Sequence, residues 1–214
     1  MAQFTIQMWV NLQSPSRQFS ICGKTSNWSN GWAIYHYGLY TTSPEDVQVL
    51  VNSWFRSDQI LAEKVVAVNT WTHLSVTFDG DSIRIYVGGN LQHEIPCQRT
   101  LLANTAPLRV GTMLWTDANP LNPETKGDWG HSDLEIADFR LYNYALTPEQ
   151  IAESFGEDLT GHEDGLLIWF RFDEPFSDLA QPVRNRSSFG AIHDGRLVAN
   201  ATVEPPRQPL PNGL

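Results

Sequence analysis

The chain opens with Phe4-Thr5-Ile6-Gln7-Met8-Trp9-Val10, a stretch in which apolar and polar residues alternate. The same alternation returns in Thr72-His73-Leu74-Ser75-Val76-Thr77-Phe78. Successive side chains of a β-strand point to opposite faces, so a period of two is typical of a strand with one face in an apolar core. Both stretches therefore predict strands that are buried on at least one side.

Further short segments of this kind follow along the chain, and loops rich in Gly, Asn, Asp, Ser and Pro separate them. Many short strands joined by such loops indicate an all-β protein, and we predict an antiparallel jelly-roll sandwich of two sheets. The additional predicted strands cover residues 19–22, 31–37, 47–55, 83–87, 91–95, 108–113, 134–142, 166–172 and 196–198.

One helical signal interrupts this pattern. The stretch Thr147-Pro148-Glu149-Gln150 offers a capping Thr, a Pro in the first turn and a Gln three residues after the Thr, as in a capping box. Ile151 and Phe155 supply an apolar side, and Gly156 is a typical stop. We expect a single short helix near residues 147–155.

Composition narrows the possible functions. The chain has 214 residues and a formal net charge of −10, which argues against nucleic acid and anionic membranes because both need a basic surface. Neutral glycans and calcium are compatible with this charge. No run of 18 apolar residues predicts a membrane span. No signal peptide is visible at the start, so we expect either a protein that is not exported or a part of a longer secreted chain.

Three stretches resemble a known family. Residues 4–11, 71–89 and 136–146 are similar to the opening strand, the central hairpin and the closing strand of laminin G-like jelly rolls in the concanavalin A-like lectin/glucanase superfamily. The resemblance implies the sandwich fold. It leaves the function open, because this fold carries binding proteins and enzymes alike.

The order of the elements differs from the family pattern. Gly165 to Glu174 resembles the strand that normally comes first, but here it follows the predicted helix. This segment either starts a second repeat or completes the same sandwich in a permuted order. We favour permutation, because about fifty residues with two strands bury too little surface to fold alone, and the main block would lack an edge strand. The expected division is a jelly-roll block at 1–156, a linker at 157–164, completing strands at 165–204 and a Pro-rich tail at 205–214.

Aromatic residues in polar loops are the candidate carbohydrate site. A sugar ring needs a flat aromatic surface against its C–H face and polar groups for its hydroxyls. Trp9, Trp71 and Trp169 lie in strand motifs and are expected to be buried. We expect Trp115 or Trp129 to be the main stacking residue. The full candidate set is Trp115, Trp129, Trp28, Trp54, Tyr37 and Tyr40.

Calcium is the one cofactor to consider. The resemblance implies a calcium-binding Asp directly after Ile136, but Ala137 stands there, so the usual site is expected to be absent. The loop between Trp115 and Asp133 is rich in oxygen ligands of the kind that calcium takes, and the alternative is a solvated acidic loop. The candidate ligands are Asp117, Asn119, Glu124 and Asp128.

The sequence offers no catalytic pair. A glycosidase needs two carboxylates facing one cleft, and the nearest run contains Glu135 and Asp138. These two are three positions apart, so in a regular strand they face opposite sides. We therefore expect a non-catalytic lectin-like or adhesion module that binds a glycan or a glycosylated surface. The alternatives are an enzyme on the same scaffold and a protein-interaction module.

Two cysteines and three short sequence motifs add little. Cys22 and Cys97 could form a disulfide in an oxidising compartment or remain buried thiols. Asn27, Asn185 and Asn200 each begin an Asn-X-Ser/Thr motif, which often arises by chance.

Overall fold

The computed structural model of the protein describes residues 2–13, 19–27, 30–36, 46–51, 60–101, 103, 107–111, 113–115, 127–129, 133–175, 178, 180–197 and 203. It describes the backbone alone for residues 19–20, 25–27, 30–36, 50, 60–61, 113–115 and 127–129. Within this part of the chain, no helix is long and apolar enough to cross a membrane.

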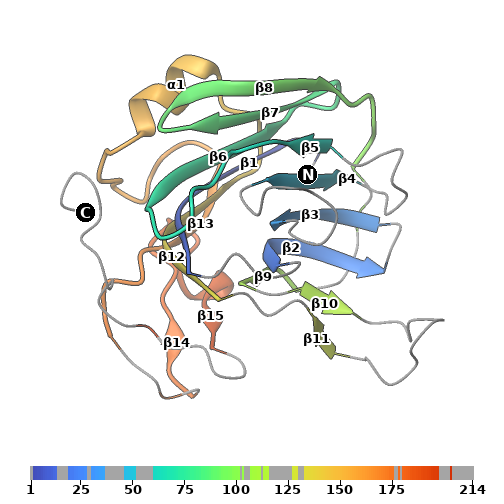
Figure 1. Cartoon of the computed structure of the whole chain (residues 1–214). Helices are drawn as coiled ribbons and strands as arrows, with labels where there is room; N and C mark the ends of the chain where they lie inside the picture. Colours follow the sequence, from blue (N-terminus) through green and yellow to red (C-terminus); the bar gives the residue numbers. More distant parts are fainter. Residues whose placement is uncertain are drawn as a thin grey trace.

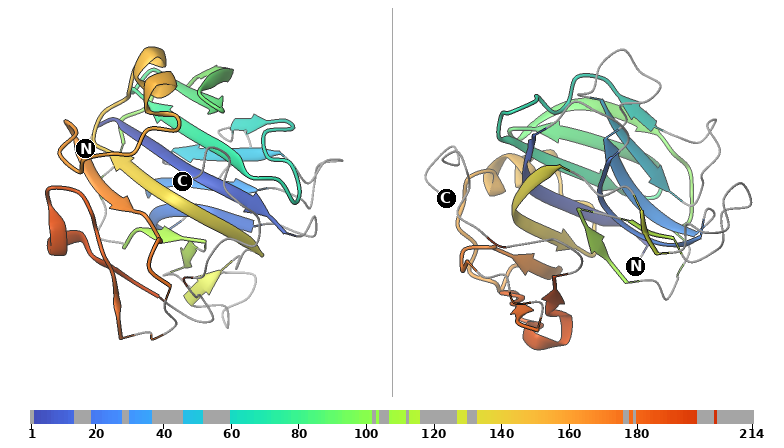
Figure 2. Two further views of the ribbon diagram at one scale, coloured as in Figure 1. Left: turned by 90° about the vertical axis from the view of Figure 1, so that its left-hand side faces the viewer. Right: turned by 60° about the horizontal axis from the view of Figure 1, so that its bottom comes forward.

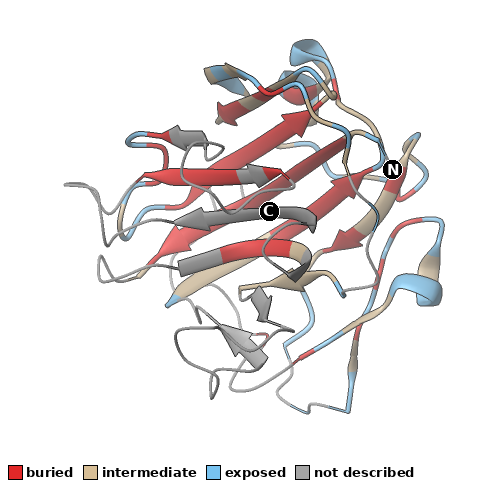
Figure 3. Ribbon diagram, turned by 90° about the vertical axis from the view of Figure 1, so that its right-hand side faces the viewer, coloured by how far each residue is buried: buried red, intermediate tan, exposed pale blue. Residues whose placement is uncertain are grey.

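The larger sheet has six antiparallel strands (Figure 1). All residues of its central strands β1 and β6 are buried, so both faces of the sheet are covered in the middle (Figure 3). In spatial order, the sheet consists of β13 (Leu166–Phe170), β12 (Leu134–Tyr142), β1 (Phe4–Leu12), β6 (Thr72–Phe78), β7 (Ser82–Val87) and β8 (Asn90–Pro96).

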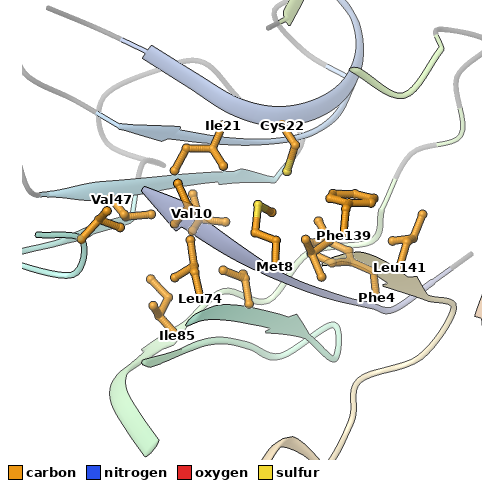
Figure 4. Close-up of a cluster of buried hydrophobic side chains, with 14 of the residues drawn as sticks. Phe4, Met8, Val10, Ile21, Cys22, Val47, Leu74, Ile85, Phe139 and Leu141 are labelled. Atoms are coloured by element: carbon orange, nitrogen blue, oxygen red, sulfur yellow. The ribbon is translucent and has the colours of Figure 1, made fainter. Parts of the chain in front are cut away.

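The smaller sheet has five strands and faces the first across the core. Met8 and Leu74 of one sheet meet Ile21 and Val47 of the other in a single apolar cluster (Figure 4). This arrangement confirms the predicted all-β sandwich. In spatial order, the second sheet consists of β5 (Ile60–Ala62), β4 (Val47–Val51), β3 (Asn30–His36), β2 (Phe19–Asn27) and β9 (Arg109–Val110).

The helix forms where its capping residues predict it. Helix α1 spans Pro148–Ser154, Thr147 caps it, and both hydrogen bonds of the capping box are present. The Thr147 N–H donates to Gln150 Oε1 over 2.9 Å, and the Gln150 N–H donates to Thr147 Oγ1 over 3.3 Å. Gly156, with φ of 81°, follows the helix in the left-handed conformation that glycine tolerates.

The C-terminal segment adds an edge strand to the larger sheet. β13 pairs antiparallel with β12, Phe139 lies opposite Phe170, and their stacked rings are 6.2 Å apart. The strand is shorter than the predicted 166–172, and Phe172 beyond its end has a positive φ of 56°. Figure 2 shows the orange and red C-terminal segment at this edge of the sheet. The larger sheet therefore contains both β1, from the start of the chain, and β13, from its C-terminal segment.

Residues 185–187 tie the rest of that segment to β13: the Arg186 N–H donates to Trp169 O and Ser187 Oγ donates to Leu167 O, each over 2.9 Å, and Asn185 adds two more bonds. Asn185 is buried, its Oδ1 accepts the Trp169 N–H over 2.8 Å, and its Nδ2 donates to Leu167 O over 3.1 Å. β14 (Pro182–Val183) precedes Asn185, and a short 3-10 helix (Gly190–His193) and β15 (Gly195–Arg196) follow it. The side-chain amide of Asn185, which begins an Asn-X-Ser motif, is therefore buried and hydrogen-bonded to β13 in the folded chain.

A bulge overturns the expectation for the acids of β12. The pairing of β1 with β12 shifts between Gln7, opposite Arg140, and Trp9, opposite Ala137. Asp138 lies in this shift with a positive φ of 52°, which changes the alternation of side chains. Asp138 and Glu135 therefore lie on the same face of the sheet, the one turned away from the other sheet, instead of on opposite faces.

The two cysteines are buried and not joined by a disulfide. Burial raises the pKa of the Cys22 thiol well above its usual range, which keeps it protonated and unreactive.

Candidate functional site

A two-stranded ribbon leaves the smaller sheet where the sequence predicted a loop. A single strand over 108–113 was expected, but Gly111, with φ of 76°, divides it into β9 and β10 (Met113–Trp115). The Gly111 N–H donates to Ile21 O over 2.7 Å and keeps the turn next to β2. β10 then pairs with β11 (Gly127–Trp129), so the predicted loop from Trp115 to Asp133 contains a strand.

The register of this ribbon brings two candidate residues together. Met113 pairs with Trp129, and Trp115 pairs with Gly127. Residues directly opposite each other share a face, and so do residues two apart in one strand. Trp115 and Trp129 therefore occupy diagonal positions on one face, which are typically about 7–8 Å apart and within reach of aromatic side chains.

The other candidate residues are not placed. The structure describes only the backbone of Asp128. The remaining candidates lie outside the described residues: Trp28, Trp54, Tyr37, Tyr40, Asp117, Asn119 and Glu124. Among the residues whose side chains are described, no group of three or more His, Cys, Asp or Glu could hold a metal ion.

Hydrogen bonds join the end of β1 to the start of β12, the first strand after the ribbon. The Gln13 N–H donates to Asp133 O over 2.9 Å. Glu135 Oε2 accepts one bond from Asn11 Nδ2 over 3.0 Å and another from Gln13 Nε2 over 2.9 Å. The sequence did not single out Asn11 or Gln13, because their partners are more than 120 positions away in the chain.

Asp138 belongs to a buried ion pair that fastens three elements. Its Oδ2 pairs with Arg140 at 2.5 Å, and its Oδ1 accepts the Trp169 indole N–H over 2.7 Å. Arg140 also donates to Ser154 O over 2.9 Å and to Glu157 O over 2.8 Å. This network joins β12, β13 and the end of α1, and it gives each Asp138 oxygen a partner within the chain.

A second polar and aromatic group lies on the face of the larger sheet on which α1 packs. We call it the covered face: Gln7, Trp9 and Asn11 of β1, His73 of β6 and Arg140 of β12. Trp9, Trp71 and Trp169 are buried as predicted, but Trp9 and Trp169 pack beneath α1 or beside it and not between the sheets. Burial, with a further contribution from the charge of Arg140, lowers the pKa of His73 to about 3.

The elements described above define a laminin G-like jelly-roll sandwich with a helix after its closing strand. The family model described as the concanavalin A-like lectin/glucanases superfamily matches residues 1–152, and the chain belongs to this family. We found no match among curated proteins.

Solved structures share the fold at low sequence identity. A Bacteroides ovatus protein named as a candidate carbohydrate-binding protein matches with a TM-score of 0.65 and 14% identity, over 95% of this chain and 55% of its own. A heptameric SAP-like pentraxin from Limulus polyphemus gives 0.52 and 15%, over 71% and 68% of the two chains. The receptor-binding domain of a botulinum neurotoxin C/D mosaic serotype gives 0.50 and 13%, over 72% and 36%. The present chain thus spans little more than half of the first of these proteins.

Proposed function

We propose that the protein is a non-catalytic carbohydrate-binding module whose binding platform is the β10–β11 ribbon. The observation that carries the proposal is the register that puts Trp115 and Trp129 on one face of the ribbon. Two neighbouring aromatic residues can stack against the C–H faces of consecutive sugar rings.

Two further observations support this function. The first structural neighbour is named as a candidate carbohydrate-binding protein, although at this identity it shares only the fold. The net charge of −10 suits an uncharged ligand, such as a neutral glycan on a glycosylated surface.

The test compares tryptophan variants of the ribbon with a matched control. A glycan array first identifies a ligand, and calorimetry then measures its affinity for the parent, Trp115→Ala, Trp129→Ala and Phe189→Ala proteins. Phe189 is an aromatic residue of the C-terminal segment and is 43% exposed, so its variant controls for the loss of an exposed ring. Burying one ring face contributes roughly 1–2 kcal/mol, so either Trp variant should bind about tenfold more weakly.

The melting temperatures show whether a Trp variant loses affinity because a binding residue is gone or because the fold is destabilised. The melting temperatures of all three variants should stay close to that of the parent. If both Trp variants bind as tightly as the control, the platform lies elsewhere and Trp28 and Trp54 are tested next. If the array ligand is shortened on incubation with the parent, the protein is an enzyme and the proposal fails.

A further inference from the structure

The surface between the larger sheet and α1 has an unusual chemistry. A helix that packs on a sheet normally does so through apolar side chains, because buried polar groups cost free energy unless they are hydrogen-bonded. The covered face instead presents an indole, an imidazole, two amides and a guanidinium, and all five side chains are at most 3% exposed.

Several of these groups lack hydrogen-bond partners. The following atoms of the covered face are fully buried and have no hydrogen-bond partner within the described part of the chain: Gln7 Oε1, Trp9 Nε1, Asn11 Oδ1, His73 Nδ1 and Arg140 Nε. Buried polar atoms are satisfied in the great majority of cases, so five exceptions on one face need an explanation. Local rules of this kind are broken mainly at functional sites.

The end of α1 covers this face through one aromatic ring and a few polar contacts. The ring of Phe155 lies 5.8 Å from the ring of Trp9 and 5.1 Å from that of His73, and the Trp9 and His73 rings are 5.2 Å apart. Gln7 Nε2 donates to Ser154 Oγ over 2.8 Å, and Arg140 donates to the backbone of Ser154 and Glu157.

The first turns of α1 are held separately. Ile151 is fully buried in an apolar cluster with Tyr86, Tyr142 and Leu146. Opening of the Phe155 end would break the 3.2 Å bond from the Phe155 N–H to Ile151 O and the bonds of Arg140, but it would leave the apolar contacts of Ile151 intact.

We propose that Trp9, His73 and Asn11 form a second carbohydrate-binding slot, which Phe155 plugs in the free protein. A neutral pyranose displaces the ring of Phe155 and stacks its C–H face on Trp9. Its hydroxyl groups then bond with the Trp9 indole N–H, Asn11 Oδ1 and His73 Nδ1. The slot is separate from the β10–β11 ribbon, and it rests on the proposed function only for the class of ligand.

The first experiment asks whether the plug opens. Amide exchange in the parent protein should be faster at residues 154–157 than in β6, since the plug opens locally. The Trp9 indole proton, followed by NMR, should exchange at least about tenfold faster in Phe155→Ala than in the parent. Phe172→Ala removes another partly buried Phe, which packs against Phe170 and the core between the sheets, and it should leave this proton unchanged.

The second experiment asks whether the open slot binds sugar. Cellotriose, xylotriose and mannotriose are titrated into the parent, Phe155→Ala and Phe155→Ala/Asn11→Ala proteins, and the Trp9 indole signal is followed. At least one sugar should bind Phe155→Ala with a dissociation constant about tenfold lower than for the parent, as judged from the shift of this signal, because Phe155 no longer competes for the slot. The added Asn11→Ala change should abolish that gain.

Failure of this inference differs from failure of the proposed function. If residues 154–157 exchange only with the whole domain, or if the exposed Trp9 signal responds to none of the sugars, Phe155 is a structural residue and the inference is wrong. Affinity that depends on Trp115 and Trp129 would remain in that case. If the parent binds no glycan but the Phe155→Ala slot does, the ribbon proposal fails and the slot stands.

Discussion

His73 should make the stability of the protein depend on pH. Its pKa is about 3 in the fold, against 6.5 for an ordinary histidine, because it is buried and close to Arg140. The unfolded chain therefore takes up a proton that the folded chain does not as pH falls from 6.5 towards 3. The stabilisation is complete above pH 6.5 and is lost through this window, by roughly 4 kcal/mol in all.

The matching variant is His73→Gln, which cannot titrate. Urea unfolding at a series of pH values should show a shallower loss of stability for this variant than for the parent between pH 6.5 and 3. Carboxylates titrate in the same range, but they contribute equally to both proteins. Parallel curves for parent and variant would show that His73 is already accessible to protons in the fold.

Ala137 leads to a prediction about calcium. It stands opposite Trp9, at the position where the family resemblance implies a calcium-binding Asp, and its methyl group cannot coordinate an ion. Treatment with EDTA should therefore change the melting temperature little, whereas loss of a saturated calcium site would cost a few kcal/mol. A large fall, measured by differential scanning fluorimetry, would instead indicate a site formed by Asp117, Asn119, Glu124 and Asp128.

At the scale of elements, Trp169 should hold β13 to β12. Its indole N–H donates to Asp138 in a buried position, so Trp169→Phe leaves one oxygen of a buried ion pair without its donor. We expect a loss of about 1–3 kcal/mol in the free energy of unfolding, measured with urea. Phe189→Ala, which removes an exposed ring of the same C-terminal segment, is the control and should lose far less. Equal effects of the two variants would mean that the indole bond does not hold the strand.

At the scale of the whole molecule, the C-terminal segment should be part of one folding unit. Deletion of residues 165–214 would open the edge of β12 and expose Phe139, and open edges promote aggregation. We expect this truncated chain to aggregate, whereas deletion of the Pro-rich tail 205–214 alone should give a folded monomer, as judged by light scattering after gel filtration. A stable monomer of 1–164 would favour the alternative that the segment begins a second repeat.

Local sequence patterns were sufficient for much of the fold. Alternation over residues 4–10 and 72–78 predicts β1 and β6, because side chains of a strand alternate whatever the partner. The capping box at Thr147 predicts α1, because its bonds join residues three positions apart. The candidate pair Trp115 and Trp129 could also be named from the sequence, since both lie in one polar segment.

Tertiary structure decided the features that depend on distant partners. The bulge at Asp138 reverses the alternation that predicted opposite faces for Glu135 and Asp138, and it arises in the pairing of β12 with β1. The pairing of β10 with β11 puts the two tryptophans on one face. The rings of Phe155 and Trp9 pack together although the two residues are almost 150 positions apart in the chain. A local pattern reports which face of an element is apolar, but the partner of that face is selected by packing of the whole chain, and no short stretch of sequence contains that information.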